Sequence, residues 1–276
     1  MRSYATYGFF GVMSSKLALQ LDTVSLGAYV SKEEVGIYGI LLFAITFMSM
    51  PFDTLKRIGK PILMDAITKD DKPAVRQLYQ RSSLILSFIG LYFFTLVVAS
   101  YHDFFSLIGQ LDKFGPFLLV FVMLGVATLV DLLGSFNGEL IIFNKYYRAQ
   151  LPMLMVLAVS NLVLNWYFIT RLKLGLHGAA LATAISLASF NLIKSVFVYA
   201  KFRLSPLKKE SVYPLLLSTL FCLLLFNFSP TTIDWLNLLL KSGLISLAFF
   251  AYFWWTPFLP ELKENLQKLL KQYLRI

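Results

Sequence analysis

Cysteine and histidine, which supply most metal sites and many catalytic centres, are nearly absent from this chain. The single cysteine, Cys222, lies within an apolar run, which excludes a disulfide framework and a cysteine-based metal site. The two histidines, His102 and His177, match no zinc-binding helix motif. We interpret both as residues of exposed outer loops.

Enzymatic motifs are missing as well. The sequence has no G-x-x-x-x-G-K-[ST] phosphate loop, so it does not hydrolyse ATP by that route. Nothing in it resembles a nucleophile elbow either. We therefore expect no catalytic residues, no bound metal and no cofactor, and we do not expect an enzyme.

Charge is scarce, whereas hydrophobic residues are abundant. Charged residues make up 14% of the chain, against about a quarter in an ordinary soluble domain, and the mean hydropathy is +0.69. The net charge of +10 comes from basic residues in short connections rather than from one patch, which argues against a nucleic-acid partner. Lipid is therefore the expected solvent for most of the chain.

Continuous apolar runs recur along the whole sequence, and each is long enough to cross a bilayer as a helix. Because these runs do not alternate with polar residues, helices are favoured over a β-barrel. The predicted fold is all-α, a polytopic integral membrane bundle of about eight transmembrane helices. Pro51 and Pro61 are interpreted as the end of the second span. The predicted spans cover residues 8–29, 35–50, 82–100, 114–133, 151–170, 178–200, 212–228 and 236–255.

Lysine and arginine are distributed unevenly between alternate connections. The set that includes both chain ends holds 18 of them, and the opposite set holds five, among them Lys241. Because basic residues are enriched in cytoplasmic loops, both termini are predicted to be cytoplasmic. The longest connection, over residues 52–81, is expected to hold no more than a short helix between turns.

Ionisable residues also fall inside predicted spans, where a charge costs from about 2.5 kcal/mol upward and usually faces the bundle interior. Lys16 and Asp22 lie in the first span, and Lys194 lies in the sixth. For the two lysines, a cationic lining that attracts a phosphate-bearing substrate competes with snorkelling to the inner interface. Asp22 is either an ion-coupling residue or one member of a structural ion pair.

Uncharged polar residues give a weaker signal. Asn161 and Asn165, at positions i and i+4, share one helix face and are typical of hydrogen bonds between helices, with a substrate pathway as the alternative. Asp131, Asn137 and Glu139 continue as a polar stretch past the fourth span. They form either a cytoplasmic gate or an ordinary helix exit.

Three segments carry a family resemblance: LDTVSLGAYVSKEEVGIYGI at 21–40, KPILMDAITKDD at 60–71 and SNLVLNWYFITRLKLGLHGAALATAIS at 160–186. Together they resemble the second half of the polysaccharide (O-antigen type) flippases, in the multidrug/oligosaccharidyl-lipid/polysaccharide exporter superfamily. Members of that family have two six-helix lobes around a central cavity, often with two further C-terminal helices.

The resemblance implies three parts for this chain. Residues 1–204 would be a six-helix, MATE-like C-terminal transporter lobe, residues 205–258 two additional transmembrane helices, and residues 259–276 a cytoplasmic amphipathic tail. No N-terminal lobe is present in the sequence. The chain is therefore expected to be a fragment of a longer protein, or to work with a partner subunit or as an oligomer.

The function that the resemblance implies is a transporter of the bacterial inner membrane. It would flip isoprenoid pyrophosphate-linked oligosaccharides for the synthesis of surface polysaccharides such as lipopolysaccharide O-antigen. Lys16, Lys194, Asn161 and Asn165 would contact the substrate, and Asp22 would couple an ion. The alternatives are a drug or cation exporter of the same superfamily, a membrane-embedded polysaccharide polymerase or acyltransferase, and a non-transporting assembly subunit.

Overall fold

The computed structural model describes residues 26–255, apart from residues 28, 207–210, 227 and 229, and all regular elements in this part are helices. The first predicted span lies almost entirely outside the described residues, and the predicted tail lies wholly outside them. The elements are α2 (Lys32–Thr68), α3 (Lys72–Leu107), α4 (Leu111–Phe114), η1 (Gly115–Phe117), α5 (Leu118–Gly134), α6 (Asn137–Ile142), η2 (Tyr147–Ala149), α7 (Gln150–Asn165), η3 (Trp166–Arg171), α8 (Gly175–Phe202), α9 (Val212–Leu225) and α10 (Asp234–Trp255).

Six helical segments in the described part are long and apolar enough to cross a bilayer, and α9 is a shorter apolar helix. Each of the last seven predicted spans coincides with one of these segments. Large apolar side chains are exposed on all the long helices, as expected where lipid replaces water. The predicted all-α polytopic membrane bundle is thus confirmed.

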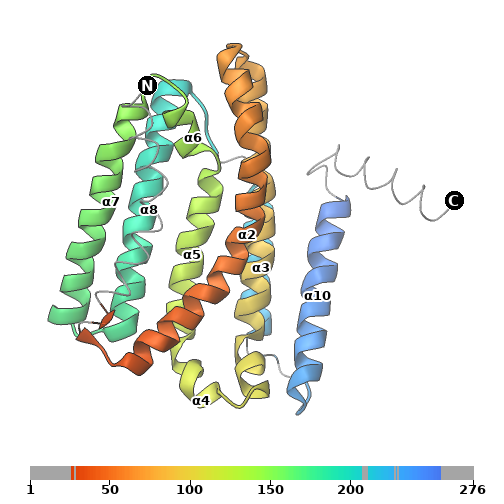
Figure 1. Cartoon of the computed structure of the whole chain (residues 1–276). Helices are drawn as coiled ribbons and strands as arrows, with labels where there is room; N and C mark the ends of the chain where they lie inside the picture. The colour runs from red at the N-terminus through yellow and green to blue at the C-terminus, as the bar shows by residue number, and fades with distance from the viewer. Residues whose placement is uncertain (1–25, 28, 207–210, 227, 229, 256–276) are drawn as a thin grey trace, which may run out of the picture.

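Helix α2 is much longer than its predicted span. It runs for 37 residues and contains both Pro51 and Pro61, so the interpretation of these prolines as the end of the span was wrong. A proline removes one helical hydrogen bond and bends a helix, but packing on both sides can keep the helix continuous. Figure 1 shows α2 crossing the bundle obliquely in its first part and standing upright beyond it.

The predicted connection over residues 52–81 is correspondingly the paired ends of α2 and α3, joined by a turn at residues 69–71. Asp70 adopts a φ of 52° in this turn. The Asp71 side chain caps α3 by accepting a hydrogen bond of 3.0 Å from the Ala74 backbone N–H. At the other end of α2, Ser31 and Glu34 form a capping box.

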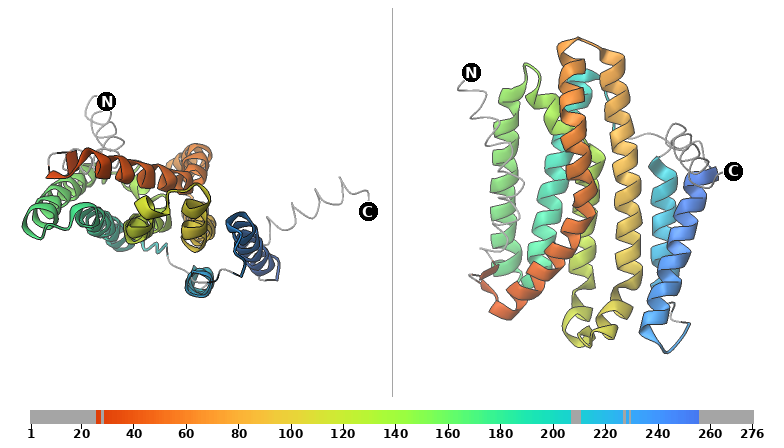
Figure 2. Two further views of the ribbon diagram at one scale, coloured as in Figure 1. Left: turned by 90° about the horizontal axis from the view of Figure 1, so that it is seen from below. Right: turned by 45° about the vertical axis from the view of Figure 1, so that its right-hand side comes forward.

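The helices form two groups that meet at α3. Helix α5 packs against α8, and α8 packs against α7, while α2 lies across α3 and α5. On the other side, α9 and α10 both pack against α3, and Figure 2 shows this pair set apart from the remaining helices. Helix α3 therefore fixes how the C-terminal pair sits on the bundle.

Small residues bring α3 and α5 into close contact. A Cβ atom added at Gly125 would lie 2.6 Å from Cε2 of Phe94, and one added at Gly90 would lie 2.6 Å from Cδ1 of Leu132. Phe94 therefore packs directly against the backbone at Gly125, and Leu132 packs against the backbone at Gly90. Such contacts at small residues are common between membrane helices. This tight packing gives the region around α5 a fixed geometry.

Candidate ionic cluster and apolar crevice

A sharp break after α5 positions the polar residues of the bundle. Helix α5 ends at Gly134, and Ser135 follows with φ 41° and ψ −108°, a conformation unusual for a residue with a Cβ atom. Helix α6 then begins at Asn137. Beyond this break, Glu139 of α6 contacts lysines of α2.

Five ionisable side chains from four helices form what we call the ionic cluster: Lys56, Lys60, Asp131, Glu139 and Lys194. The Oε1 atom of Glu139 lies 3.3 Å from Nζ of Lys56 and 3.3 Å from Nζ of Lys60. Nζ of Lys194 lies 3.6 Å from Oδ1 of Asp131 and 4.2 Å from the centre of the Phe190 ring. Lys194 also interacts electrostatically with Lys56 and Glu139, which makes the five residues one cluster.

Glu139 is held in its charged form by this arrangement. Burial acts to raise the pKa of Glu139, but the charges of Lys56 and Lys60 together with hydrogen bonds to the carboxylate outweigh it and hold the pKa below the ordinary value. The contribution of this carboxylate to stability is therefore present at neutral pH and is lost as the pH falls through its lowered pKa. With three lysines and two carboxylates, the ionic cluster carries one excess positive charge.

Neutral hydrogen bonds fix the α6 side of the cluster. The Oδ1 atom of Asn137 accepts a hydrogen bond of 2.6 Å from the Tyr79 hydroxyl, and its Nδ2 donates one of 2.9 Å to Oγ of Ser195. Asn137 and Tyr79 are almost fully buried. One asparagine thus ties α6 to α3 and to α8.

Replacing Asn137 with alanine is expected to lower the free energy of unfolding by about 1–3 kcal/mol, because the buried Tyr79 hydroxyl loses its hydrogen bond to Oδ1 of Asn137. Thermal unfolding in detergent measures the effect. Asn144→Ala is the matched control, since Asn144 bonds a carbonyl one turn back on the chain, that of Leu140, and should cost clearly less. Equal losses in the two variants would contradict the assigned role of Asn137.

The residues predicted from sequence fall in different places. Lys194 lies in the ionic cluster, and its side chain is 11% exposed. Asn161 and Asn165 lie further along α7 and are buried. Nδ2 of Asn165 donates to Oδ1 of Asn161 at 3.1 Å, and Nδ2 of Asn161 donates to Oγ1 of Thr183 at 3.3 Å.

The two asparagines therefore make a hydrogen bond from α7 to α8, which is the structural role weighed for them. Lys16 and Asp22, the other predicted site residues, lie outside the described residues. For Asp131 and Glu139 the sequence allowed two interpretations, a cytoplasmic gate or an ordinary helix exit. Both residues belong to the ionic cluster.

Lys56 and Lys60 were not predicted as site residues. The sequence places them four residues apart, which is one helical turn, but both were assigned to a connection because Pro51 precedes them. Their spacing becomes informative only when α2 continues through that proline. The sequence therefore contained the spacing of the two lysines, but the predicted end of the helix before Pro51 hid its meaning.

A second buried ion pair joins α10 to α3. Nζ of Lys241 lies 2.5 Å from Oδ2 of Asp103 and donates a further hydrogen bond of 3.2 Å to the Ala99 carbonyl. The two side chains are only 1% and 5% exposed. The assignment of Lys241 to an outer connection was wrong, because it lies within α10 and its charge is satisfied inside the bundle.

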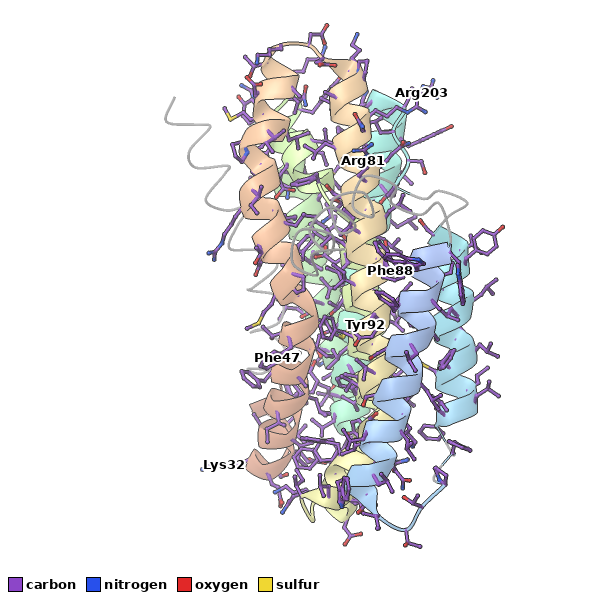
Figure 3. All side chains as sticks on the ribbon, turned by 90° about the vertical axis from the view of Figure 1, so that its right-hand side faces the viewer. Lys32, Phe47, Arg81, Phe88, Tyr92 and Arg203 are labelled. Carbon is purple, nitrogen blue, oxygen red and sulfur yellow. The ribbon has the colours of Figure 1, made fainter. Side chains whose placement is uncertain are left out.

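An apolar crevice with a volume of about 1290 Å³ lies along α2, α3 and α10. Figure 3 shows these three helices side by side, with Phe47 on α2 and Lys32 at the end of that helix. Three charged residues, Lys32, Glu33 and Lys113, also line the crevice. Most other lining residues are apolar, among them Phe43, Phe47, Phe93, Phe104, Leu238 and Leu239.

Several of these lining side chains are also accessible from outside the bundle. Phe43, Phe47 and Phe104 are exposed to 64%, 51% and 48%. A crevice of this composition, on the lipid-facing side of membrane helices, suits a hydrocarbon chain better than a polar solute.

The two histidines lie in helices rather than in loops, His102 in α3 and His177 in α8, and both are half-buried. Among the residues that the structure describes, no three histidine, cysteine or carboxylate side chains come together as a metal site would require.

These features define the chain as an all-α, multi-pass membrane protein with an ionic cluster between α2, α5, α6 and α8 and an apolar crevice along α2, α3 and α10. Comparison with models of known protein families, with curated proteins and with solved structures finds no match to this chain. The resemblance to flippases is therefore a hypothesis that depends on the residues alone.

Proposed function

We propose that this chain is the C-terminal part of a transporter that flips isoprenoid pyrophosphate-linked oligosaccharides across the bacterial inner membrane. The observation that supports this most directly is that one helix, α2, lines the apolar crevice and also reaches the ionic cluster. The proposed substrate has the same two parts, a long hydrocarbon chain and a strongly anionic head group.

The spacing along α2 suits such an amphiphile. Phe47 lines the crevice and Lys56 enters the ionic cluster, so the two sites are separated by about 13 Å along the helix axis. Phosphoryl oxygens accept charge-assisted hydrogen bonds from lysine ammonium groups. The isoprenoid chain would occupy the crevice while the head group meets the lysines.

The charge of the ionic cluster favours this substrate over a drug or another cation. Three lysines outnumber two carboxylates, and a site with an excess of positive charge repels cations and attracts anions. The side chains of Lys56 and Lys194 are largely buried. Salt therefore screens their positive charge less than it would at an exposed position.

Alternating access in transporters of this kind arises when one lobe rocks against another around a shared site. We propose that a second lobe, on a longer form of the same chain or on a partner subunit, completes the pathway with this chain. Both termini of the chain would then face the cytoplasm, as the distribution of basic residues predicts.

The transport test uses vesicles from cells that lack the native copy and carry a tagged full-length chain, so that any native partner is present. The fraction of lipid-linked oligosaccharide accessible on the outer leaflet is measured. Lys16→Ala and Lys194→Ala are expected to abolish transport without loss of protein from the membrane. Lys69→Ala, which removes a lysine paired with the exposed Asp65, is the matched control and should transport normally.

Transport at the wild-type rate by Lys194→Ala would rule out a role for this lysine in head-group binding. Equal leaflet distributions with and without the chain would rule out the flippase assignment itself.

A further inference from the structure

The contact between α2 and α6 is made by one carboxylate that is shared between two lysines. Lys56 and Lys60 lie one turn apart on α2, and both ammonium groups converge on the same atom, Oε1 of Glu139. The other oxygen, Oε2, is buried and has no hydrogen-bond partner among the described residues. Glu139 therefore uses half of its hydrogen-bonding capacity, in a place where burial is costly.

An oxygen held between two ammonium groups is also the arrangement that a phosphate group adopts at a lysine pair. Glu139 brings a charge of −1 to this position, whereas a phosphate or pyrophosphate brings more negative charge and several acceptor oxygens. The site is accessible, because the Lys60 side chain is 43% exposed and that of Lys56 is 20% exposed. Nearby, Lys194 adds positive charge on the α8 side.

We propose that Lys56 and Lys60 form a binding site for a phosphate-class anion and that Glu139 occupies this site until the anion displaces it. The inference rests on the proposed function in one respect, since it names the pyrophosphate head group of the substrate as the natural anion. Displacement of Glu139 breaks the ionic contact between α2 and α6. The carboxylate is thus a counter-ion that closes the site and a latch that holds α2.

Two prolines in α2 make this helix able to bend when the contact with Glu139 is broken. Pro51 and Pro61 each remove a helical hydrogen bond on either side of the lysine pair. Gly59, between the lysines, packs directly on Phe136, where a Cβ atom would lie 2.5 Å from Cζ. When Glu139 is displaced, the end of α2 beyond Pro51 is expected to move away from α6.

Binding is tested first with inorganic pyrophosphate on the full chain in phosphatidylcholine nanodiscs, by titration calorimetry. Glu139→Gln keeps the shape of the side chain and removes its charge, so it is expected to bind pyrophosphate at least about tenfold more tightly than wild type. The double variant Lys56→Gln, Lys60→Gln is expected to lose binding. Asp65→Asn, which breaks the exposed pair with Lys69 on the same helix, should bind as wild type does.

Unchanged or weaker binding by Glu139→Gln would overturn the proposal, and so would wild-type affinity in the double lysine variant. The two lysine side chains are partly exposed, so the double lysine variant keeps the test decisive if Glu139→Gln is not recovered as folded protein.

A second arm distinguishes a free anion from a lipid head group. Nanodiscs that contain a polyprenyl phosphate are compared with nanodiscs of phosphatidylcholine alone. If the lipid lowers the apparent affinity for pyrophosphate by competition, and the double lysine variant abolishes this effect, the head group of a lipid occupies the site. If only the free anion binds, the anion site is confirmed, but the lipid-linked substrate of the proposed function is contradicted.

The latch is tested by a distance between spin labels at Arg57→Cys on α2 and Lys145→Cys after α6, both exposed positions, with Cys222→Ser as background. Pyrophosphate is expected to lengthen or broaden this distance in the wild-type background. Glu139→Gln should show the longer distance without ligand. An identical distance distribution in all three samples would overturn the latch.

Discussion

Replacing Lys241 with alanine is expected to lower the free energy of unfolding by about 3–5 kcal/mol, because the buried carboxylate of Asp103 would lose the ammonium group that lies 2.5 Å from it. Both side chains are almost fully buried, so water does not replace the lost partner of Asp103. Unfolding in detergent micelles, followed by tryptophan fluorescence, measures the loss. Because the pair joins α10 to α3, cross-linking between these two helices should also decrease.

A double variant distinguishes two causes of the lost stability, the buried charge of Asp103 and the lost packing of the Lys241 side chain. The double variant Lys241→Met, Asp103→Leu removes both charges and is expected to recover most of the stability, since apolar side chains of similar size can replace a buried pair. Lys113→Ala breaks the pair with Glu33, which is largely exposed, and should cause no measurable loss. Equal effects of Lys241→Ala and Lys113→Ala would contradict the burial of Lys241.

Filling the apolar crevice is expected to reduce transport by at least about tenfold, which corresponds to about 1.4 kcal/mol of lost binding. Ala44 lines the crevice on α2, and tryptophan at this position would take up space that the isoprenoid chain requires. The leaflet assay described above measures the rate. Thermal unfolding is measured in parallel to show that the bundle remains folded.

Val159→Trp is the matched control for this experiment. Val159 is 59% exposed on α7 and does not line the crevice, so a tryptophan there also faces lipid. It is expected to leave transport unchanged. If both variants transport equally well, the crevice does not hold the lipid chain.

The helices themselves could be predicted almost completely from the sequence. Continuous apolar runs predicted eight spans, and each of the seven that lie in the described part of the chain coincides with a helical segment. The reason is local: in lipid a segment must satisfy its backbone hydrogen bonds internally, so a long apolar run has few alternatives to a helix. The boundaries were less predictable at Pro51, where packing of α2 on α3 keeps the helix continuous past a residue that normally breaks one.

The candidate site could be predicted only in part. Lys194 and Glu139 stood out as charges in or next to apolar spans, whereas Lys56 and Lys60 resembled ordinary basic residues of a loop. Nothing in the order of residues indicates that two lysines of α2 share one oxygen of Glu139, which is about 80 positions away along the chain. The same is true of Lys241 and Asp103.

By itself, the sequence determined that this is a multi-pass helical membrane protein, because hydropathy acts through each segment separately. Tertiary structure decided which charges meet. Ion pairing depends on the positions of side chains on different helices, and these are set by packing contacts such as Gly59 on Phe136 and by the turn at Ser135. The ionic cluster and the apolar crevice are products of that packing, and no single segment contains either of them.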